Sequence, residues 1–126
     1  MNNLLERAQT LLRELNNRTV VAQTAITDIK YLPCDYKTDN TLPELSAMQN
    51  FGGKWGGAND THAWFAFDID VPSGDNMRHE VFVDSGVNGW DLSNPQFLVY
   101  VDGKIAQGLD TNHRSFVVGE GNHTVY

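Results

Sequence analysis

This chain of 126 residues has a single cysteine, few basic side chains and no long apolar run. The one cysteine, Cys34, excludes an intramolecular disulfide framework. No apolar run approaches the roughly 20 residues that span a bilayer. The amino terminus is amphipathic and charged throughout, whereas a signal peptide needs an unbroken apolar core. The sequence therefore predicts a cytoplasmic protein with no membrane partner.

Basic residues are outnumbered, with nine Lys and Arg against sixteen Asp and Glu, for a formal net charge of −7. They are also scattered singly along the chain. Duplex nucleic acid needs several cations converging on one face, and an anionic surface repels phosphate. The same reasoning weighs against anionic membranes. We therefore expect no nucleic-acid partner.

Motifs of catalytic and metal sites are missing as well. The four histidines are His62, His79, His113 and His123. None shows the H-x-H, H-x-D or H-E-x-x-H spacing that aims two ligands at one metal. No nucleophile elbow, P-loop or dinucleotide fingerprint occurs, and nothing supplies the base that a nucleophilic Cys34 needs. The sequence predicts no catalytic residue, metal or cofactor in this chain.

Two groups of acidic residues are candidate sites. Asp68 and Asp70 are two residues apart on one predicted strand, and paired carboxylates hydrolyse glycosides, but a solvated strand face is the simpler interpretation. Asp84, Asn88 and Asp91 could place oxygens around calcium, yet their spacing matches no known calcium loop. Ordinary turn chemistry is favoured there.

An amphipathic helix is predicted within an N-terminal helical segment, residues 1–30. Its apolar stripe consists of Leu4, Leu5, Ala8, Leu11, Leu12 and Leu15. Asn16-Asn17 is the expected stop, and the continuation to residue 29 could be a second helix or an early strand. Something must cover the stripe, and a second copy of the chain is one candidate, which makes a homo-oligomer one expectation.

Residues 31–62 are predicted to be a long irregular segment that wraps the surface, because they combine prolines and paired glycines with several aromatics. Residues 63–126 then alternate with a period of two. Short strands separated by turn signals such as Asp102-Gly103 predict a mainly β chain, a β-sandwich of jelly-roll or galactose-binding-like type. Residues 123–126 begin another strand where the chain stops. We expect the sandwich to be truncated there, with an unpaired sheet edge.

Flat aromatic side chains are the candidates for stacking on sugar rings. Trp55, Trp64 and Trp90 are most simply core residues. Trp64 faces the opposite side of its strand from Phe65, so it is the best contact candidate if that side is uncovered. Trp55 is the second.

Two stretches are more specific than a generic β-protein. One is residues 56–65 (GGANDTHAWF); the other comprises residues 89–91 (GWD), 94–104 (NPQFLVYVDGK) and 107–114 (QGLDTNHR). Together with the preceding helix and residues 29–31 (IKY), they resemble the amino-terminal domain of α-mannosidases of glycoside hydrolase family 38, in the branch of cytosolic and bacterial enzymes. The resemblance spans nearly the whole chain, and the G-x-D-x-N-H-R stretch is its strongest element.

The resemblance implies a non-catalytic accessory domain at the front of a long enzyme that hydrolyses α-mannosides with retention of configuration. The catalytic barrel, with its zinc ion, would follow in the same polypeptide. Asp110, Asn112, His113 and Arg114 are then candidates for contacting that barrel or the rim of its active site. The alternative for this loop is a self-bonded turn. The alternative for the chain is a stand-alone sandwich that binds a mannose-containing glycan or another protein.

Overall fold

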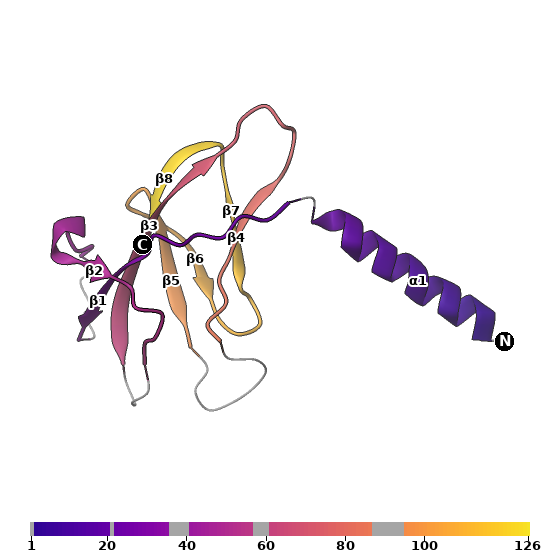
Figure 1. The fold of residues 1–126 in the computed structure, drawn as a ribbon, viewed down its shortest axis with the longest axis horizontal. Helices are drawn as coiled ribbons and strands as arrows, with labels where there is room; N and C mark the ends of the chain where they lie inside the picture. Colours follow the sequence, from indigo (N-terminus) through magenta and orange to yellow (C-terminus); the bar gives the residue numbers. More distant parts are fainter. Residues whose placement is uncertain (1, 21, 36–40, 57–60, 87–94) are drawn as a thin grey trace.

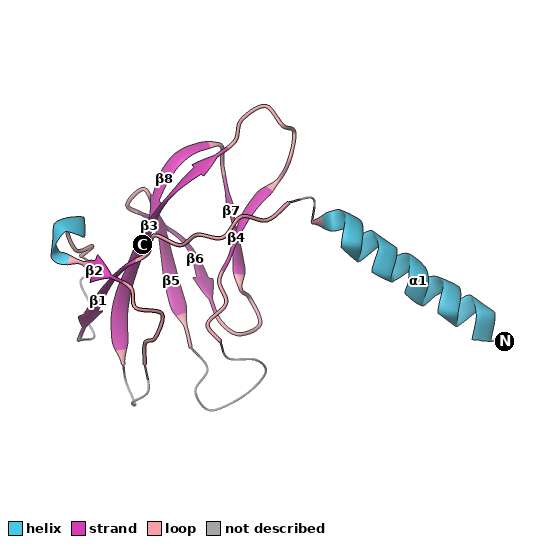
Figure 2. Ribbon diagram, viewed as in Figure 1, coloured by secondary structure: helices cyan, strands magenta, loops and turns pink. Residues whose placement is uncertain are grey.

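The computed structural model describes residues 2–20, 22–35, 41–56, 61–86 and 95–126, and it is mainly β with an N-terminal helix (Figures 1 and 2). The helix is α1 (Asn2–Thr19), and a short 3-10 helix follows at Leu45–Ala47. The strands are β1 (Lys30–Cys34), β2 (Gln49–Asn50), β3 (His62–Val71), β4 (His79–Phe82), β5 (Phe97–Val101), β6 (Lys104–Leu109), β7 (Ser115–Val118) and β8 (Gly121–Val125).

Within the described residues, the strands form two antiparallel sheets of unequal size. Six strands lie in the order β2-β1-β3-β8-β5-β6, and β4 pairs only with β7. The last strand, β8, lies inside the larger sheet, where it pairs with β3 on one side and with β5 on the other. The prediction of an unpaired edge at residues 123–126 is therefore wrong, because both neighbours of this strand come from earlier in the chain.

The two sheets share one apolar layer, which makes the arrangement sandwich-like, as predicted. Alternation along β3 turns Phe67, Ile69 and Val71 to this layer. The buried members come from both sheets: Val71, Val81, Val99, Leu109, Phe116, Val118 and Val125. Burial of apolar area on this scale is the main favourable term in folding.

The opposite face of the six-stranded sheet carries a second aromatic group. Trp64 packs against Tyr100 and Tyr126, with ring centroids 5.8 and 6.4 Å apart. The Tyr126 hydroxyl donates a hydrogen bond of 3.1 Å to the carbonyl of Pro43, and Met48 is buried. The segment before β2 thus lies against this face of the sheet.

The prediction of an irregular segment over residues 31–62 is wrong in part. The segment contains β2 and most of β1, and β1 pairs with β3 over five residues, from Lys30↔Ala66 to Cys34↔His62. Its sequence, KYLPC, includes a proline and shows no clear alternation, so long-range pairing and not local pattern makes it a strand.

The N-terminal helix runs to Thr19, past the expected stop at Asn16-Asn17, and stands clear of the sheets (Figure 1). Residues 22–29 are neither helix nor strand. Ile26 nevertheless packs against the shared apolar layer, which ties the segment to the sandwich.

A polar contact joins the β5–β6 turn to β8. Asp102 and Gly103 have φ values of 51° and 80°, as the predicted tight hairpin requires. The Asp102 carboxylate lies 2.7 Å from Nδ1 of His123 and accepts a hydrogen bond from the Thr124 amide. Nε2 of His123 lies 2.9 Å from the carbonyl oxygen of Gly119. Since acceptors face both ring nitrogens, the site favours the doubly protonated imidazolium.

These contacts raise the pKa of His123 and lower the pKa of Asp102. The hydrogen bond that His123 donates to Asp102 is the main reason that the pKa of His123 lies above its usual 6.5, and the same bond is the main reason that the pKa of Asp102 lies below 3.8. The His123 contribution to stability is complete below pH 6.5 and is lost as pH rises through the raised pKa. The Asp102 contribution is present above pH 3.8 and is lost as pH falls through the lowered pKa.

We therefore predict that Asp102→Asn lowers the melting temperature most near pH 5, where both contributions are complete, and less above pH 7. Asparagine tolerates the left-handed turn, so the variant removes charge without breaking the hairpin. Thermal melts of both proteins between pH 4 and pH 8 measure the difference. Asp70→Asn, which removes the same charge from an exposed position of β3, is the control, and an equal pH-dependent loss there would contradict the prediction.

Candidate functional site

The polar loop, which we define as residues 110–114, joins β6 to β7 and is anchored in the core at both ends. Leu109 precedes it and Phe116 lies just beyond it, and both side chains belong to the shared apolar layer. The Thr111 side chain within the loop is buried as well. The loop is therefore held in position by the sandwich.

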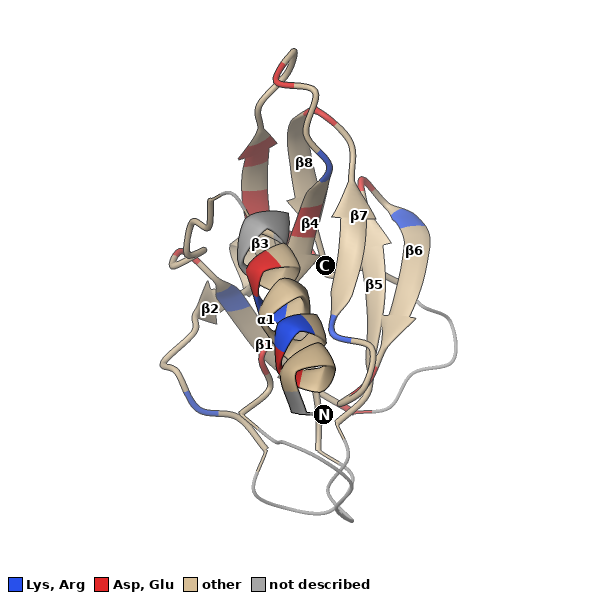
Figure 3. Cartoon of the chain, turned by 90° about the vertical axis from the view of Figure 1, so that its right-hand side faces the viewer, with Lys and Arg blue, Asp and Glu red and all other residues tan. Residues whose placement is uncertain are grey.

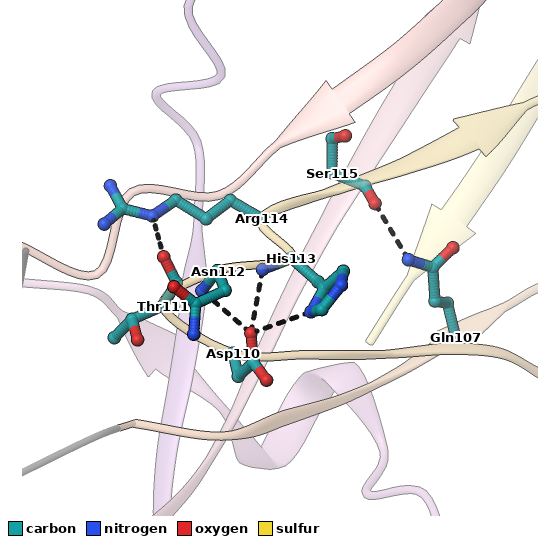
Figure 4. A network of polar contacts seen from close by, with 7 residues as sticks. All are labelled: Gln107, Asp110, Thr111, Asn112, His113, Arg114 and Ser115. Carbon is teal, nitrogen blue, oxygen red and sulfur yellow. Dashed lines mark hydrogen bonds and ion pairs between the residues drawn. The ribbon is translucent and has the colours of Figure 1, made fainter. Parts of the chain in front are cut away.

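The carboxylate of Asp110 organises the backbone of the loop (Figure 4). Its Oδ1 accepts hydrogen bonds of 2.8 Å from the amides of Asn112 and His113, and Nδ1 of His113 lies 3.2 Å from the same oxygen. The Asp110 amide donates in turn to the His113 carbonyl. The two amides, more than the imidazole, hold the pKa of Asp110 below 3.8.

Arg114 closes the other side of the loop. Its Nε donates a 2.7 Å hydrogen bond to the carbonyl of Thr111, and its own carbonyl accepts from the amide of Val83, just after β4. Nearby, the Gln107 side chain donates to the Ser115 carbonyl (Figure 4). These bonds make the loop internally bonded, which is the simpler of the two interpretations that its sequence allowed. They also leave Asn112 and His113 exposed at its surface.

The loop geometry does not suit acid–base catalysis by Asp110. A carboxyl group that donates a proton near neutral pH needs a raised pKa, and here the pKa is lowered. The other weighed carboxylate on β3, Asp68, accepts a hydrogen bond from the Thr124 hydroxyl and is exposed, as is Asp70. The solvated strand face predicted for Asp68 and Asp70 is confirmed.

An exposed apolar patch lies beside the polar loop. On the outer face of the β4–β7 sheet, Phe82 is 64% exposed and Val117 is also exposed. The residues Arg78, Glu80, Asn112 and His113 flank a hollow of about 320 Å³ at this place. We call the apolar pair and these four polar residues the docking face.

Alternation along residues 79–83 turns Val81 and Val83 toward the shared apolar layer and leaves Phe82 on the outer, polar side of the strand. Phe82 was not among the contact residues predicted from the sequence. A large aromatic on the solvent side of an alternating strand is the signal that could have revealed it, because contiguous exposed apolar area often marks a contact site.

The two tryptophans predicted as sugar contacts lie in separate aromatic groups. Trp55 packs edge-on against Phe65 with centroids 5.3 Å apart, and against Phe97 at 5.7 Å. Trp64 lies on the other face of the sheet, with Tyr100 and Tyr126. Both are half-buried. The structure therefore does not bring them together, and the side that Trp64 faces is contacted by other residues.

Three other candidate residues, Asn88, Trp90 and Asp91, lie outside the described residues. Among those that the structure describes, no three His, Cys, Asp or Glu side chains are grouped to hold a metal ion. Lys and Arg are dispersed over separate elements (Figure 3). No helix in the described part of the chain is long and apolar enough to cross a membrane.

We predict that Asp110→Asn frees the amides of Asn112 and His113. Hydrogen exchange at these two amides is expected to accelerate by about fivefold to tenfold, as for the loss of roughly 1 kcal/mol of hydrogen bonding, while β7 stays protected. The control is Asp84→Asn, which alters a similar bond to the Gly86 amide and should affect only that turn. Unchanged exchange at residues 112 and 113 would show that the carboxylate does not hold the loop.

Comparison with models of protein families, with curated proteins and with solved structures found no match to this chain. Its function is therefore inferred from its own residues and geometry.

Proposed function

We propose that this chain is a non-catalytic accessory domain that packs against the catalytic barrel of an α-mannosidase of glycoside hydrolase family 38. The observation that carries the docking role is the exposed docking face. The resemblance of residues 56–65, 89–91, 94–104 and 107–114 to the amino-terminal domain of that family supports the choice of partner. The single cysteine supports a cytoplasmic setting.

The docking face has the composition of a protein interface. Interfaces combine an aromatic or apolar centre with a polar rim. Here Val117 lines the same hollow as the charged and amide side chains, and Phe82 follows Glu80 by two residues on the same exposed face of β4. The Arg78–Glu80 ion pair, at 3.0 Å, is exposed, so it contributes little stability by itself. Both groups remain available to polar partners across an interface.

The polar loop is organised before any partner arrives. Its backbone is held by Asp110 and by the bond from Arg114 to Thr111, so association does not have to order it. Avoiding that entropic cost favours binding. Asn112 and His113 are the loop residues whose exposed side chains suit contact with a barrel or with its active-site rim.

In this proposal, catalysis belongs to the barrel. The zinc ion that the family uses would be held there, as the resemblance implies. The domain would position and stabilise the barrel and shape the surroundings of its active site, without contributing a reacting group.

A stand-alone carbohydrate-binding role is less well supported. Sugar binding by modules of this kind relies on an accessible flat aromatic face, and both Trp55 and Trp64 pack against other rings. The hollow beside the polar loop has an aromatic residue in Phe116, but that side chain is buried.

Phe82→Ser tests the docking role. In the 126-residue chain the variant should leave the melting temperature nearly unchanged, because Phe82 is exposed. In a polypeptide that also contains the barrel, it should weaken the contact between domains by at least about 1 kcal/mol and lower hydrolysis of an aryl α-mannoside. The control is Ile105→Ser on β6, equally exposed at 61% but paired with Tyr100, whose ring faces away from the β4–β7 sheet.

Equal effects of the two serine variants in the longer polypeptide would contradict the docking role. Adding mannose or mannobiose to the 126-residue chain separates the alternative. A saturable change in tryptophan fluorescence at millimolar sugar would support a carbohydrate-binding module, and release of mannose by this chain alone would refute the non-catalytic assignment.

A further inference from the structure

Helix α1 presents a continuous apolar stripe to solvent. Its 18 residues correspond to a length of about 27 Å. The exposed fractions of its five leucines range from 58% to 82%: Leu4, Leu5, Leu11, Leu12 and Leu15. Helices in proteins owe most of their stability to burial of such a face, and soluble monomers seldom leave a large apolar patch exposed.

The stripe has the spacing of a coiled-coil seam. Leu4, Ala8, Leu11 and Leu15 follow one another at steps of four, three and four residues, which is the alternation of the two core positions of a heptad. Leu5 and Leu12 widen the stripe along one flank. A seam widened in this way is typical of a helix that packs against other helices in a bundle.

The other flank carries one charge of each sign. Arg7 and Glu14 lie seven residues apart and therefore hold the same heptad position. If two copies of α1 pair antiparallel, so that Leu4 faces Leu15 and Ala8 faces Leu11, like flanks meet. Arg7 of each copy then lies beside Glu14 of the other. Charges at flanking positions set helix orientation in such pairs.

A parallel pair lacks this complementarity. Unlike flanks would meet, and Arg7 would lie beside Leu12 of the second copy. The placement of α1 favours the antiparallel arrangement too, since the helix projects from the sandwich with its amino terminus at the far end (Figure 1). Antiparallel pairing puts the two sandwiches at opposite ends of the helix pair and closes the assembly with twofold symmetry.

We propose that α1 is a self-association element, and that two copies of this chain pair through antiparallel α1 helices joined by a leucine seam and two Arg7–Glu14 contacts. This inference is independent of the proposed mannosidase role, because it uses only residues of the helix and the position of the sandwich.

Charge exchange in the 126-residue chain provides the test, with sedimentation velocity measured from micromolar to several hundred micromolar protein at low salt. The wild-type chain should form dimers or a larger even-numbered assembly. Arg7→Glu, and separately Glu14→Arg, should weaken association by roughly threefold to tenfold. Each variant turns both contacts between the two helices into pairs of like charge. The double exchange should restore association.

Both single exchanges place charges favourably for the helix dipole, an acid nearer the amino terminus or a base nearer the carboxyl terminus. Weaker association therefore cannot come from loss of the helix, which circular dichroism verifies. Arg13→Glu and Glu6→Arg alter net charge by the same amounts on the side of the helix away from the stripe, and are the controls for net charge. Their charges are placed unfavourably for the helix dipole, so circular dichroism verifies their helix as well. Leu11→Ser should abolish association while tryptophan fluorescence shows the sandwich intact.

Several results would overturn the proposal. A wild-type chain that stays monomeric at several hundred micromolar would assign the leucine stripe to a different partner. Association that responds equally to Arg7→Glu and Arg13→Glu would reflect net charge alone. Failure of the double exchange to restore association would exclude the antiparallel pairing.

Discussion

The apolar layer between the two sheets is the constraint on which the other features depend. It takes side chains from β3, β5, β6 and β8 on one side and from β4 and β7 on the other. Within the described residues, the smaller sheet consists of two strands, β4 and β7. Their inner face is buried against the larger sheet, and their outer face leaves Phe82 and Val117 exposed. The same layer anchors Leu109 and Phe116, which hold the polar loop at its ends.

Several aspartate side chains in turns and strands accept hydrogen bonds that hold the backbone or a neighbouring side chain in place. Asp110 binds amides of its own loop, Asp102 binds His123 and Thr124, and Asp68 accepts from the Thr124 hydroxyl. Hydrogen bonds to the charged form stabilise it and lower the pKa, as seen for Asp102 and Asp110. Such carboxylates stiffen turns and are poorly suited to proton transfer near neutral pH.

Two exposed apolar features lie on one side of the molecule. Viewed toward the helix, β4 and β7 lie on the same side as α1 (Figure 3). The docking face is small, with a polar rim, and suits another folded domain; the leucine stripe of α1 is linear and suits another helix. Their difference in shape matches the two different contacts that we propose, one with a folded domain and one between copies of the chain.

Local pattern in the sequence was sufficient for the helix, for the alternating strands β3, β5 and β7, and for the Asp102-Gly103 turn, because each depends on neighbouring residues along the chain. It also indicated the self-bonded turn at Asp110. Only the tertiary structure decided that residues 30–34 are a strand, that β8 lies between β3 and β5, and that Phe82 has nothing packed over it in the described chain. These features depend on residues far apart in sequence, and no periodicity within a short window encodes which distant strand will supply the hydrogen bonds or the covering side chains.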